Sequence, residues 1–514
     1  MSKIKVIDLF SGPGGLGEGF TSVKDKNGQP IFKIATSIEK EPSAHRTLTL
    51  RAFFRQFDIV PIDYYDFLRG LLGKTPNEQL YPKFPKEYKA ASEEALCLEL
   101  GKDNDEITKA IQNEVGQEEC ILIGGPPCQA YSIVGVARNK GNKNYDPAKD
   151  HRNFLYKEYL AVIAKFQPKI FVMENVKGML SAKVNGKLIY KDIFTDLQAP
   201  TKASGESPLD GRSVHSYQIF SLVNGGEEAS LNPQDYVVKS EQFGIPQNRH
   251  RVILLGIRDD VDTSSLSTLE LAQYQINVND VIGDLPPLRS GLSKSENSDK
   301  NWVKTIKKET RVALRELKIN HPDLVSTMKN EIEALNSELD QGALFGYRRT
   351  PTKNNPLADW YFDKKLGTHI CNHETRSHID SDLARYLFCS CWGKTYEKDN
   401  RFASPKSYDF PSSLVPAHKS FNTGKFADRF RVQLKGKPAT TITSHISKDG
   451  HYYIHPDPKQ CRSLTVREAA RIQTFPDNYF FVGTRTQQYV QIGNAVPPLL
   501  ANQIAKLVTK ILNI

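Results

Sequence analysis

A cysteine stands directly behind a short apolar run in the first third of the chain. Cys128 follows the run Ile121–Gly125 after two prolines, Pro126 and Pro127. Each proline fixes its φ angle and removes a backbone donor, so the pair holds the chain rigidly as it leaves the predicted strand. A thiol becomes a nucleophile as its thiolate. A lone cysteine is more often a small buried apolar residue, but the rigid flank and the Gly- and Lys-rich segment behind it favour a working nucleophile.

An acid and two arginines border two later apolar runs. Glu174 closes the segment Lys-Ile-Phe-Val-Met-Glu, and Gln247-Asn-Arg-His-Arg251 precedes the run Val252–Ile257. Arg249 and Arg251 alternate with one other residue, so in an extended chain they lie on one face. Both arginines could point into the same cleft as Glu174. The alternative is a capped structural acid and a surface pair of arginines.

A glycine-rich turn lies near the amino terminus, in VIDLFSGPGGLGEGF. Its Gly12-x-Gly14-x-x-Gly17 spacing is that of a dinucleotide-binding turn, in which the backbone approaches its ligand closely. Glu39 ends the next predicted strand, where a carboxylate can accept hydrogen bonds from ribose hydroxyls. NAD and S-adenosylmethionine (SAM) both carry adenosine, so this turn alone leaves both cofactors open.

These groups require a parallel sheet to bring them together. Apolar runs predict strands at Ile4–Phe10, Lys33–Glu39, Asp58–Ile62, Ile121–Gly125, Ile170–Val176, Gln218–Val223 and Val252–Ile257. A helix is predicted from Asn153 to Pro168, and strand, crossover helix and strand form a right-handed βαβ unit. The predicted fold class is therefore α/β, a Rossmann-like, mostly parallel sheet with helices on both faces, together with a smaller irregular domain.

The length of 514 residues exceeds what one hydrophobic core serves. We predict one domain from residues 1–261 and 461–514, and a second from residues 262–460, where strands and helices do not alternate. Residues 73–118 are polar and predict a helical insertion in the first domain. Thr465 and Glu468 have capping-box spacing and predict the start of a helix.

Composition points to a polyanionic partner. The net charge is +10, and residues 401–460 hold ten Lys and Arg against four Asp and Glu. A local basic excess favours nucleic acid; an ordinary solvated surface is the alternative. The seven scattered cysteines do not form a disulfide pattern. Without a signal-peptide pattern or an apolar run long enough for a bilayer, a cytoplasmic protein is expected.

The motifs together resemble the DNA (cytosine-5) methyltransferase family. DLFSGPGGLGEGF, GGPPCQAYS, MENV, QNRHR, SLTVREAARIQTFPD and QIGNAVPP occur here in that family's order. The resemblance implies duplex DNA as substrate, Cys128 as nucleophile, and Glu174, Arg249 and Arg251 as catalytic partners. It also places the family's target-recognition domain at residues 262–460.

The resemblance also assigns a cofactor site and DNA contacts. It implies SAM as cofactor, with S-adenosyl-L-homocysteine as product, and no metal. The implied SAM-binding residues are Phe10, Ser11, Gly12, Gly14, Glu39, Asp63, Pro127, Leu155, Asn494 and Val496, with Asp66 a rival to Asp63. Gln129, Ser132 and Gln247 are implied DNA contacts, and the segment Tyr131–Lys149 would close over a base turned out of the duplex. A monomeric bacterial enzyme of the nucleoid, paired with a restriction endonuclease, is the expectation.

The sequence also allows four other interpretations. A tRNA methyltransferase of the same family would carry a Cys-Phe-Thr signature, which this sequence lacks. A DNA-binding protein without catalysis, or an NAD oxidoreductase, would leave the cysteine and arginine motifs without a purpose. Histidines and cysteines between residues 369 and 391 could bind zinc, but their spacing is not typical of a zinc site.

Overall fold

The computed structural model describes residues 3–127, 155–184, 187–225, 232–335, 338–347, 355–399, 404–417 and 427–514. The chain divides into two compact units. Unit 1 comprises Met1–Val60, Tyr81–Tyr274 and Ala495–Ile514, and unit 2 comprises Pro61–Leu80 and Gln275–Asn494. These bounds differ from the predicted domains, because residues 61–80 and 461–494 belong to unit 2.

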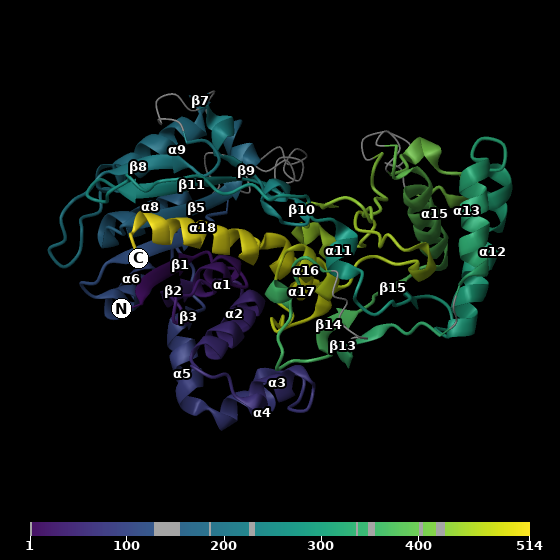
Figure 1. Ribbon diagram of the computed structural model, residues 1–514, viewed down its shortest axis with the longest axis horizontal. Coiled ribbons are helices and arrows are strands. Elements are labelled where there is room, and N and C mark those ends of the chain that lie inside the picture. Colours follow the sequence, from purple (N-terminus) through teal and green to yellow (C-terminus); the bar gives the residue numbers. More distant parts are fainter. Residues whose placement is uncertain are drawn as a thin grey trace. The chain divides into compact units, whose positions relative to one another are not determined.

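Unit 1 is built on a twisted sheet of eight strands among the described residues (Figure 1). Its order is β3 (Ala95–Leu96), β2 (Phe32–Ile38), β1 (Ile4–Leu9), β4 (Cys120–Gly124), β5 (Ile170–Val176), β11 (His250–Arg258) and β8 (Tyr217–Ser221), with β9 (Val237–Lys239) also paired to β11. The first five strands in this order are parallel. The strand β11 runs antiparallel to β5, β8 and β9. The mostly parallel α/β sheet predicted from the sequence is confirmed.

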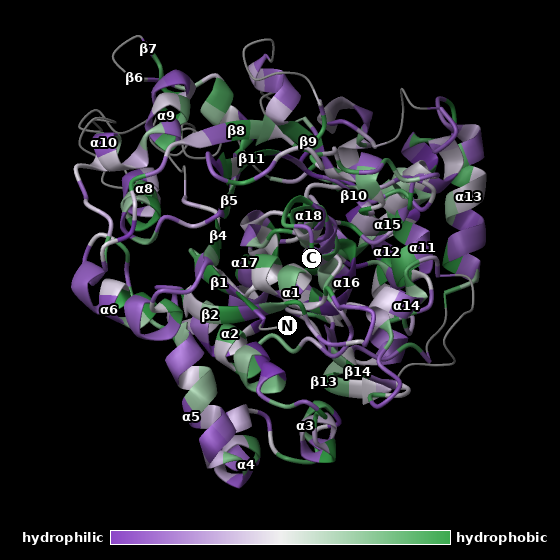
Figure 2. Ribbon diagram, turned by 60° about the vertical axis from the view of Figure 1, so that its left-hand side comes forward, coloured by the Kyte–Doolittle hydropathy of each residue, from purple (hydrophilic) through white to green (hydrophobic). Residues whose placement is uncertain are grey.

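Helices cover both faces of this sheet. Alternate strand residues divide into two cores, one containing Val6 and Ile121 and the other Ile7 and Leu122. The helices α1 (Gly15–Thr21) and α18 (Pro498–Ile511) pack on the first face; α6 (Asn104–Val115), α8 (Leu155–Phe166) and α9 (Ile189–Gln198) pack on the second. The strands of the sheet are coloured mainly hydrophobic in Figure 2, as expected for strands that are buried on both faces.

The third strand of the sheet is not where the sequence pattern placed it. Residues 58–62 form no strand, and Ile59 and Ile62 are exposed. The third strand is β3, which pairs with the end of β2. It lies within the predicted insertion, after α4 (Pro76–Lys83) and α5 (Pro85–Glu94) and before α6. Because α6 buries Ile107, Ile111 and Val115 against the sheet core, part of this segment belongs to the α/β fold itself.

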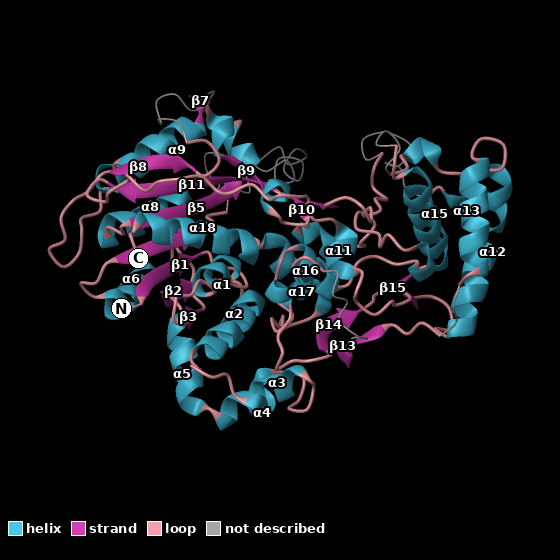
Figure 3. Cartoon of the chain, in the orientation of Figure 1, coloured by secondary structure: helices cyan, strands magenta, loops and turns pink. Residues whose placement is uncertain are grey.

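Unit 2 contains its own helical core. The helices α12 (Asp299–Glu316), α13 (Pro322–Glu333) and α15 (Asp380–Tyr396) enclose Trp302, Met328 and Trp392. Short strand pairs accompany them, β12 (Gly291–Leu292) with β15 (Ser377–His378) and β13 (Gly342–Tyr347) with β14 (His369–Glu374). The remaining helices include α3 (Ile62–Leu68), α11 (Val278–Ile282), α16 (Val466–Ile472) and α17 (Arg485–Asn494), with long loops between them (Figure 3). In the described ranges no helix is both long and apolar enough to cross a membrane.

Candidate active site

The glycine turn joins β1 to α1 at the carboxyl edge of the sheet. Phe10 and Gly12 have φ angles of 55° and 58°, and Gly14, the N-cap of α1, has a φ of 96°. These left-handed conformations favour glycine. A Cβ on Gly12 would meet no atom within 4 Å, so open space lies beside this backbone. The Ser11 hydroxyl donates to the Asp8 carbonyl over 2.8 Å, which keeps this side chain within the turn.

Glu39 lies beside the glycine turn because β1 and β2 are parallel neighbours. Leu9 and Ile38 are register partners, so the next residues leave the sheet side by side. The Gly12 amide donates to Glu39 Oε2 over 2.8 Å, and the Glu41 amide donates to Oε1 over 2.7 Å. Burial raises the pKa of Glu39, and the two amides oppose that rise. The carboxylate is thus fixed at the turn, where the sequence predicted it.

A segment from the carboxyl-terminal part of the chain completes the turn. A Cβ on Gly15 would lie 2.2 Å from the carbonyl oxygen of Val496, and a Cβ on Gly19 would lie 2.3 Å from Cβ of Ala501. Only glycine permits these two approaches of α1 to the segment that contains α18. Val496 therefore touches the predicted cofactor turn, whereas Asn494 is exposed and belongs to unit 2.

The end of β4 lies on the other side of the glycine turn. A Cβ on Gly124 would meet the Leu9 carbonyl oxygen at 2.5 Å, and one on Gly125 would meet Glu174 Oε2 at 3.1 Å. The Asn175 side-chain amide donates to the Pro126 carbonyl over 3.3 Å. Segment 124–127 thus runs directly beside Glu174, as far as Pro127, which is partly buried.

Several predicted site residues fall in a range that the structure does not describe. Cys128, Gln129, Ser132 and the segment Tyr131–Lys149 lie outside the described residues. Leu155 is buried at the first described position of α8.

Glu174 forms an ion pair with Arg251 across two adjacent strands. Arg251 Nε lies 2.9 Å from Glu174 Oε1, and the two side chains are 17% and 14% exposed. In the antiparallel register Ile253 faces Glu174, so Arg251 stands two residues along β11 on the same face. This partly exposed pair holds a carboxylate and a guanidinium together beside the end of β4.

Arg249 and Gln247 occupy different surroundings from Arg251. The side chain of Arg249 is 2% exposed, and its carbonyl accepts a hydrogen bond from the Ser240 hydroxyl over 2.7 Å. Arg251 therefore forms an ion pair with Glu174, whereas Arg249 lies in a buried position. That both arginines share a cleft with Glu174 stays a prediction. Gln247, an expected DNA contact, is fully buried.

The two aspartates considered for the adenine amino group lie in unit 2. Asp63 stands in the first turn of α3, and Asp66 forms an ion pair with Arg69 at 2.8 Å. Glu39 and the glycine turn belong to unit 1. A shared adenosine site for Asp63 and Glu39 thus remains a prediction.

Asp8, which the sequence analysis did not select, is buried beneath the glycine turn. Its side chain is fully buried, and no donor in the described residues satisfies either carboxylate oxygen. Burial raises its pKa to about 8, against the opposing charge of Arg55. A Cβ on Gly17 would lie 3.1 Å from Asp8 Oδ2. An acid inside an otherwise apolar strand was the signal that could have identified it.

The histidines and cysteines of residues 369–391 have separate structural partners. Cys371 Sγ donates to the Leu68 carbonyl over 3.0 Å, and His373 bridges the Thr465 hydroxyl and the Pro286 carbonyl. The Tyr386 hydroxyl contacts His378 Nδ1 at 3.3 Å. Within the described chain these residues do not form a group with metal-ligand geometry.

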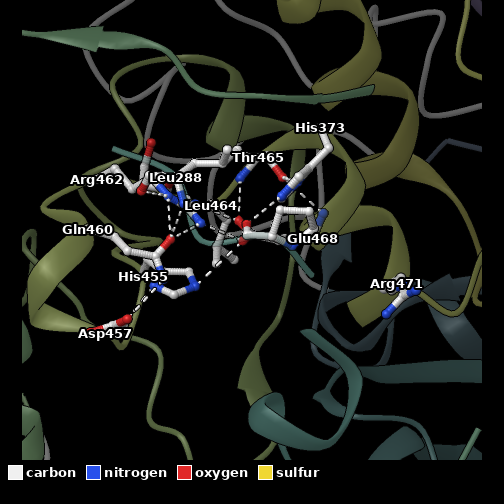
Figure 4. A network of polar contacts seen from close by, with 12 residues as sticks. Leu288, His373, His455, Asp457, Gln460, Arg462, Leu464, Thr465, Glu468 and Arg471 are labelled. Carbon is white, nitrogen blue, oxygen red and sulfur yellow. Dashed lines mark hydrogen bonds and ion pairs between the residues drawn. The ribbon is translucent and has the colours of Figure 1, made fainter. Parts of the chain in front are cut away.

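The helix predicted at Thr465 begins as expected and anchors a buried polar network (Figure 4). Glu468 accepts two hydrogen bonds of 2.7 Å from Arg462, and one of 2.7 Å from the Thr465 amide. His455 Nε2 lies 3.5 Å from the same carboxylate. Burial lowers the pKa of His455 to about 3 and that of His373 to about 4. Both rings are neutral near pH 7, and the network is a structural element of unit 2.

The family follows from comparison with known sequences. A family model described as C-5 cytosine-specific DNA methylase matches residues 89–198 and 227–510, more than half of the chain. The chain belongs to this family. The methylase is 32% identical to the type II methyltransferase M.Bpa9945I of Bacillus paralicheniformis, over 99% of both chains. It is 25% identical to the type II methyltransferase M.AgeI of Thalassovita gelatinovora, over 98% of this chain and 99% of that one.

A solved structure supports the fold of the methylase. A DNA modification methyltransferase encoded within an E. coli prophage has a TM-score of 0.55 and 19% identity, with all of both chains covered. The sequence matches confirm that this methylase is a DNA (cytosine-5-)-methyltransferase, of the type II class of restriction–modification systems. Membership of the family implies the use of SAM.

The residues at the carboxyl edge of the sheet fit SAM. In open α/β sheets, ligands bind at the carboxyl ends of the strands. They bind at the point where the strand order reverses, so that the connections from adjacent strands run to opposite sides. Here β1 is that point, because β2 and β4 flank it. The open space beside Gly12 admits a ligand next to the backbone, and the fixed Glu39 carboxylate can accept hydrogen bonds from ribose hydroxyls.

Proposed function

We propose that Cys128 is the nucleophile of this DNA cytosine-5 methyltransferase and that Glu174 and Arg251 bind the reacting cytosine. The supporting observation is the ion pair of Glu174 with Arg251 beside Gly125. Cys128 is the next residue in the sequence after Pro127, so the thiol follows the segment that runs past this pair. Family membership supplies the reaction.

The chemistry needs a nucleophile because C5 of cytosine is itself a weak one. The Cys128 thiolate forms a bond to C6, and the electron pair of the C5–C6 double bond moves toward C5, N3 and O2. Glu174 in its protonated form donates a hydrogen bond to N3, and the Arg251 guanidinium donates to O2, so both groups stand where negative charge develops. When bound, SAM supplies an electrophilic methyl group. Transfer of that methyl to C5 would release S-adenosyl-L-homocysteine. Loss of the C5 proton to a base then lets the Cys128 sulfur leave C6, which restores the C5–C6 double bond.

The ion pair orients both side chains before the substrate enters. A guanidinium at 2.9 Å from the carboxylate keeps Glu174 oriented and supplies the cation for O2. Preorganised groups of this kind contribute because they need not rearrange during the reaction. Arg249, which is buried behind the strand end, supports the segment and is proposed as a positioning residue.

We infer that SAM binds at the glycine turn. Phe10, Ser11, Gly12 and Gly14 form the turn, Glu39 holds the ribose, and Pro127, Leu155 and Val496 line the pocket. Asp63 and Asn494, which belong to unit 2, stay proposed contacts of the adenine and of the methionine part.

The DNA substrate requires a base turned out of the duplex. C5 and C6 are covered by stacking in a duplex, so the cytosine must leave the helix, at a cost of about a few kcal/mol. We propose that residues of 262–460 recognise the target sequence in the major groove, where the four base pairs are distinguishable. Gln129 and Ser132 are proposed DNA contacts; Gln247, which is fully buried, is not. The enzyme is proposed to act as a monomer in the bacterial cytoplasm, with S-adenosyl-L-homocysteine as product and a cognate endonuclease.

The nucleophile is tested by covalent trapping. Bisulfite sequencing of a plasmid from cells that express the enzyme identifies the target site. A duplex with 5-fluorocytosine at that position should then form a stable adduct with the enzyme and SAM, because fluorine cannot leave as the proton does. Cys128→Ala should form no adduct.

A matched variant separates the nucleophile from other thiols. Cys97 is exposed, so Cys97→Ala should form the adduct as the wild-type enzyme does. An adduct with Cys128→Ala would show that another residue is the nucleophile. A wild-type enzyme that methylates ordinary duplex but forms no adduct would refute covalent catalysis.

A further inference from the structure

The helix α12 of unit 2 carries basic side chains along one face. The helix covers Asp299–Glu316, and the next turn adds one more lysine. Six exposed basic residues are defined here as the α12 stripe: Lys300, Lys304, Lys307, Arg311, Arg315 and Lys318. Lys308 is also exposed, but it pairs with Glu309 and is not counted in the stripe. Steps of three or four residues put all six on one side of an α-helix. At a rise of about 1.5 Å per residue the stripe is about 27 Å long.

The stripe lies opposite the buried face of the same helix. Trp302, Ile306 and Ala313 pack into the core of unit 2 and are fully buried. Over about three turns the helix thus places apolar residues inward and cations outward. Figure 1 shows α12 at the edge of the group formed with α13 and α15, so the outward face is not covered by these helices.

The acids of α12 do not neutralise the stripe. Asp299 pairs with Arg289 at 2.6 Å, Glu309 pairs with Lys308 at 3.4 Å, and Glu316 accepts hydrogen bonds from two serines, Ser412 and Ser413. Within the described part of the chain no carboxylate forms an ion pair with a residue of the stripe. A solvated helix face usually mixes both signs of charge, whereas this face carries one sign.

We propose that the α12 stripe binds the phosphate backbone of the duplex beside the target site. The inference rests on duplex DNA as the substrate of the family. Cations every 4.5–6 Å along the helix suit a row of phosphates, and such contacts position a protein without reading sequence. The stripe therefore adds affinity from flanking DNA, separate from base recognition.

The test replaces three central charges of the stripe. Lys304→Gln, Lys307→Gln and Arg311→Gln are combined, because glutamine keeps helix propensity and removes charge. Binding to a long duplex with the target at its centre is measured by fluorescence anisotropy at several salt concentrations, without turnover. Each lost phosphate contact makes the slope of log K against log salt less negative by about 0.9, so a change of about 2–3 is expected. Affinity at about 0.15 M salt should fall about tenfold or more.

A control triple variant loses the same charge elsewhere. Lys24, Lys26 and Lys33 are exposed at the amino edge of the unit 1 sheet, away from the strand ends that hold the glycine turn. Their replacement by glutamine should change the salt slope by less than one. Thermal unfolding of both variants should match that of the wild-type enzyme, since all six positions are exposed.

A short duplex distinguishes flanking contacts from contacts at the target. On a duplex trimmed to the target site, the stripe variant should bind as tightly as the wild-type enzyme, and kcat at saturating DNA should be unchanged on both duplexes. Equal losses on both duplexes, or a salt slope equal to that of the control variant, would overturn the proposal. Because binding is measured without methyl transfer, failure of the catalytic proposal would leave this result unchanged.

Discussion

Arg251 and Glu174 meet at 2.9 Å although they are 77 positions apart in the sequence, because β11 runs antiparallel to β5 and places them on one face. The pair is partly exposed, whereas the neighbouring Arg249 is 2% exposed. Arg251 is therefore the more exposed cation of the two, and it is the one proposed to meet the cytosine.

Removal of this cation should slow the chemical step. Arg251→Ala is expected to lower the single-turnover rate of methyl transfer about 10²- to 10³-fold, because a preorganised charge at O2 is lost. The same fold-change is expected for Glu174→Gln. The double variant should lose less than the product of the two single losses, since the groups act as a pair.

Arg258 provides the matched control for that prediction. It lies at the other end of β11 and pairs with Glu119 at 2.9 Å and Asp260 at 2.7 Å. Arg258→Ala should lower the melting temperature but leave the single-turnover rate of the folded enzyme within about twofold. A rate loss as large as that of Arg251→Ala would show that the arginine acts through folding rather than at the substrate.

Alanine variants at two glycines of similar backbone conformation should distinguish backbone strain from an effect on cofactor binding. Gly12 and Gly28 have φ angles of 58° and 78°, and a Cβ on either would meet no atom within 4 Å. Gly12→Ala and Gly28→Ala should each cost about 1–2 kcal/mol of unfolding free energy from the left-handed backbone. Only Gly12→Ala should weaken SAM binding, measured by calorimetry, because its methyl group would occupy the open space at the turn. Equal SAM affinity in both variants would contradict the proposed site.

Asp8 should make stability depend on pH in the opposite direction to an ordinary surface acid. Its pKa is about 8 in the folded chain and 3.8 as the reference value, so between these values the folded state keeps a proton that the unfolded state has lost. The contribution of this group to stability therefore falls as pH rises from about 4 to 8. Asp8→Asn should raise the melting temperature clearly at pH 8 and little at pH 5. A constant difference at both pH values would show that Asp8 is ionised in the folded enzyme.

Two of the buried histidines of unit 2, His455 and His373, should make it sensitive to acid. His455 and His373 have pKa values lowered to about 3 and about 4, so below pH 6.5 the unfolded chain binds protons that the folded chain does not. When the pH is lowered from 6.5 to 5, each ring should reduce the free energy of unfolding by about 2 kcal/mol. His373→Gln should make the pH dependence shallower, as measured by urea unfolding at both pH values. An unchanged slope would mean that the ring is protonated in the native state.

The sequence predicted the sheet of unit 1 better than the helices of unit 2. Buried parallel strands are continuous apolar runs, and such runs were visible at β1, β4, β5 and β11. The helix α15 is buried all round, from Leu383 to Gly393, so it has no polar face and no amphipathic period. In α12 the buried positions include Thr305 and Thr310, which weakens the apolar pattern.

The site was predictable where the chemistry is local and less so where it depends on packing. The glycine turn and Glu39 follow from spacing along the sequence, and the structure brings them within hydrogen-bond distance. Side chains of a strand alternate between its two faces, so Arg249 and Arg251, two residues apart, were predicted on the same face. This pattern could not show that only Arg249 is buried. The strand β3 has only two residues, which is too short to show an apolar run. The exposed segment 58–62 was therefore predicted as the third strand instead.

The contact of Val496 with Gly15, and of Ala501 with Gly19, has a consequence for how the enzyme matures on the ribosome. The turn that follows β1 receives its supporting helix, α18, from a part of the chain that is translated much later. A chain whose translation stops before codon 495 leaves the apolar side of α1 bare and cannot finish the cofactor turn. A chain truncated in this way is therefore expected to lack methylating activity, even though it contains Glu174, Arg251 and the proposed nucleophile.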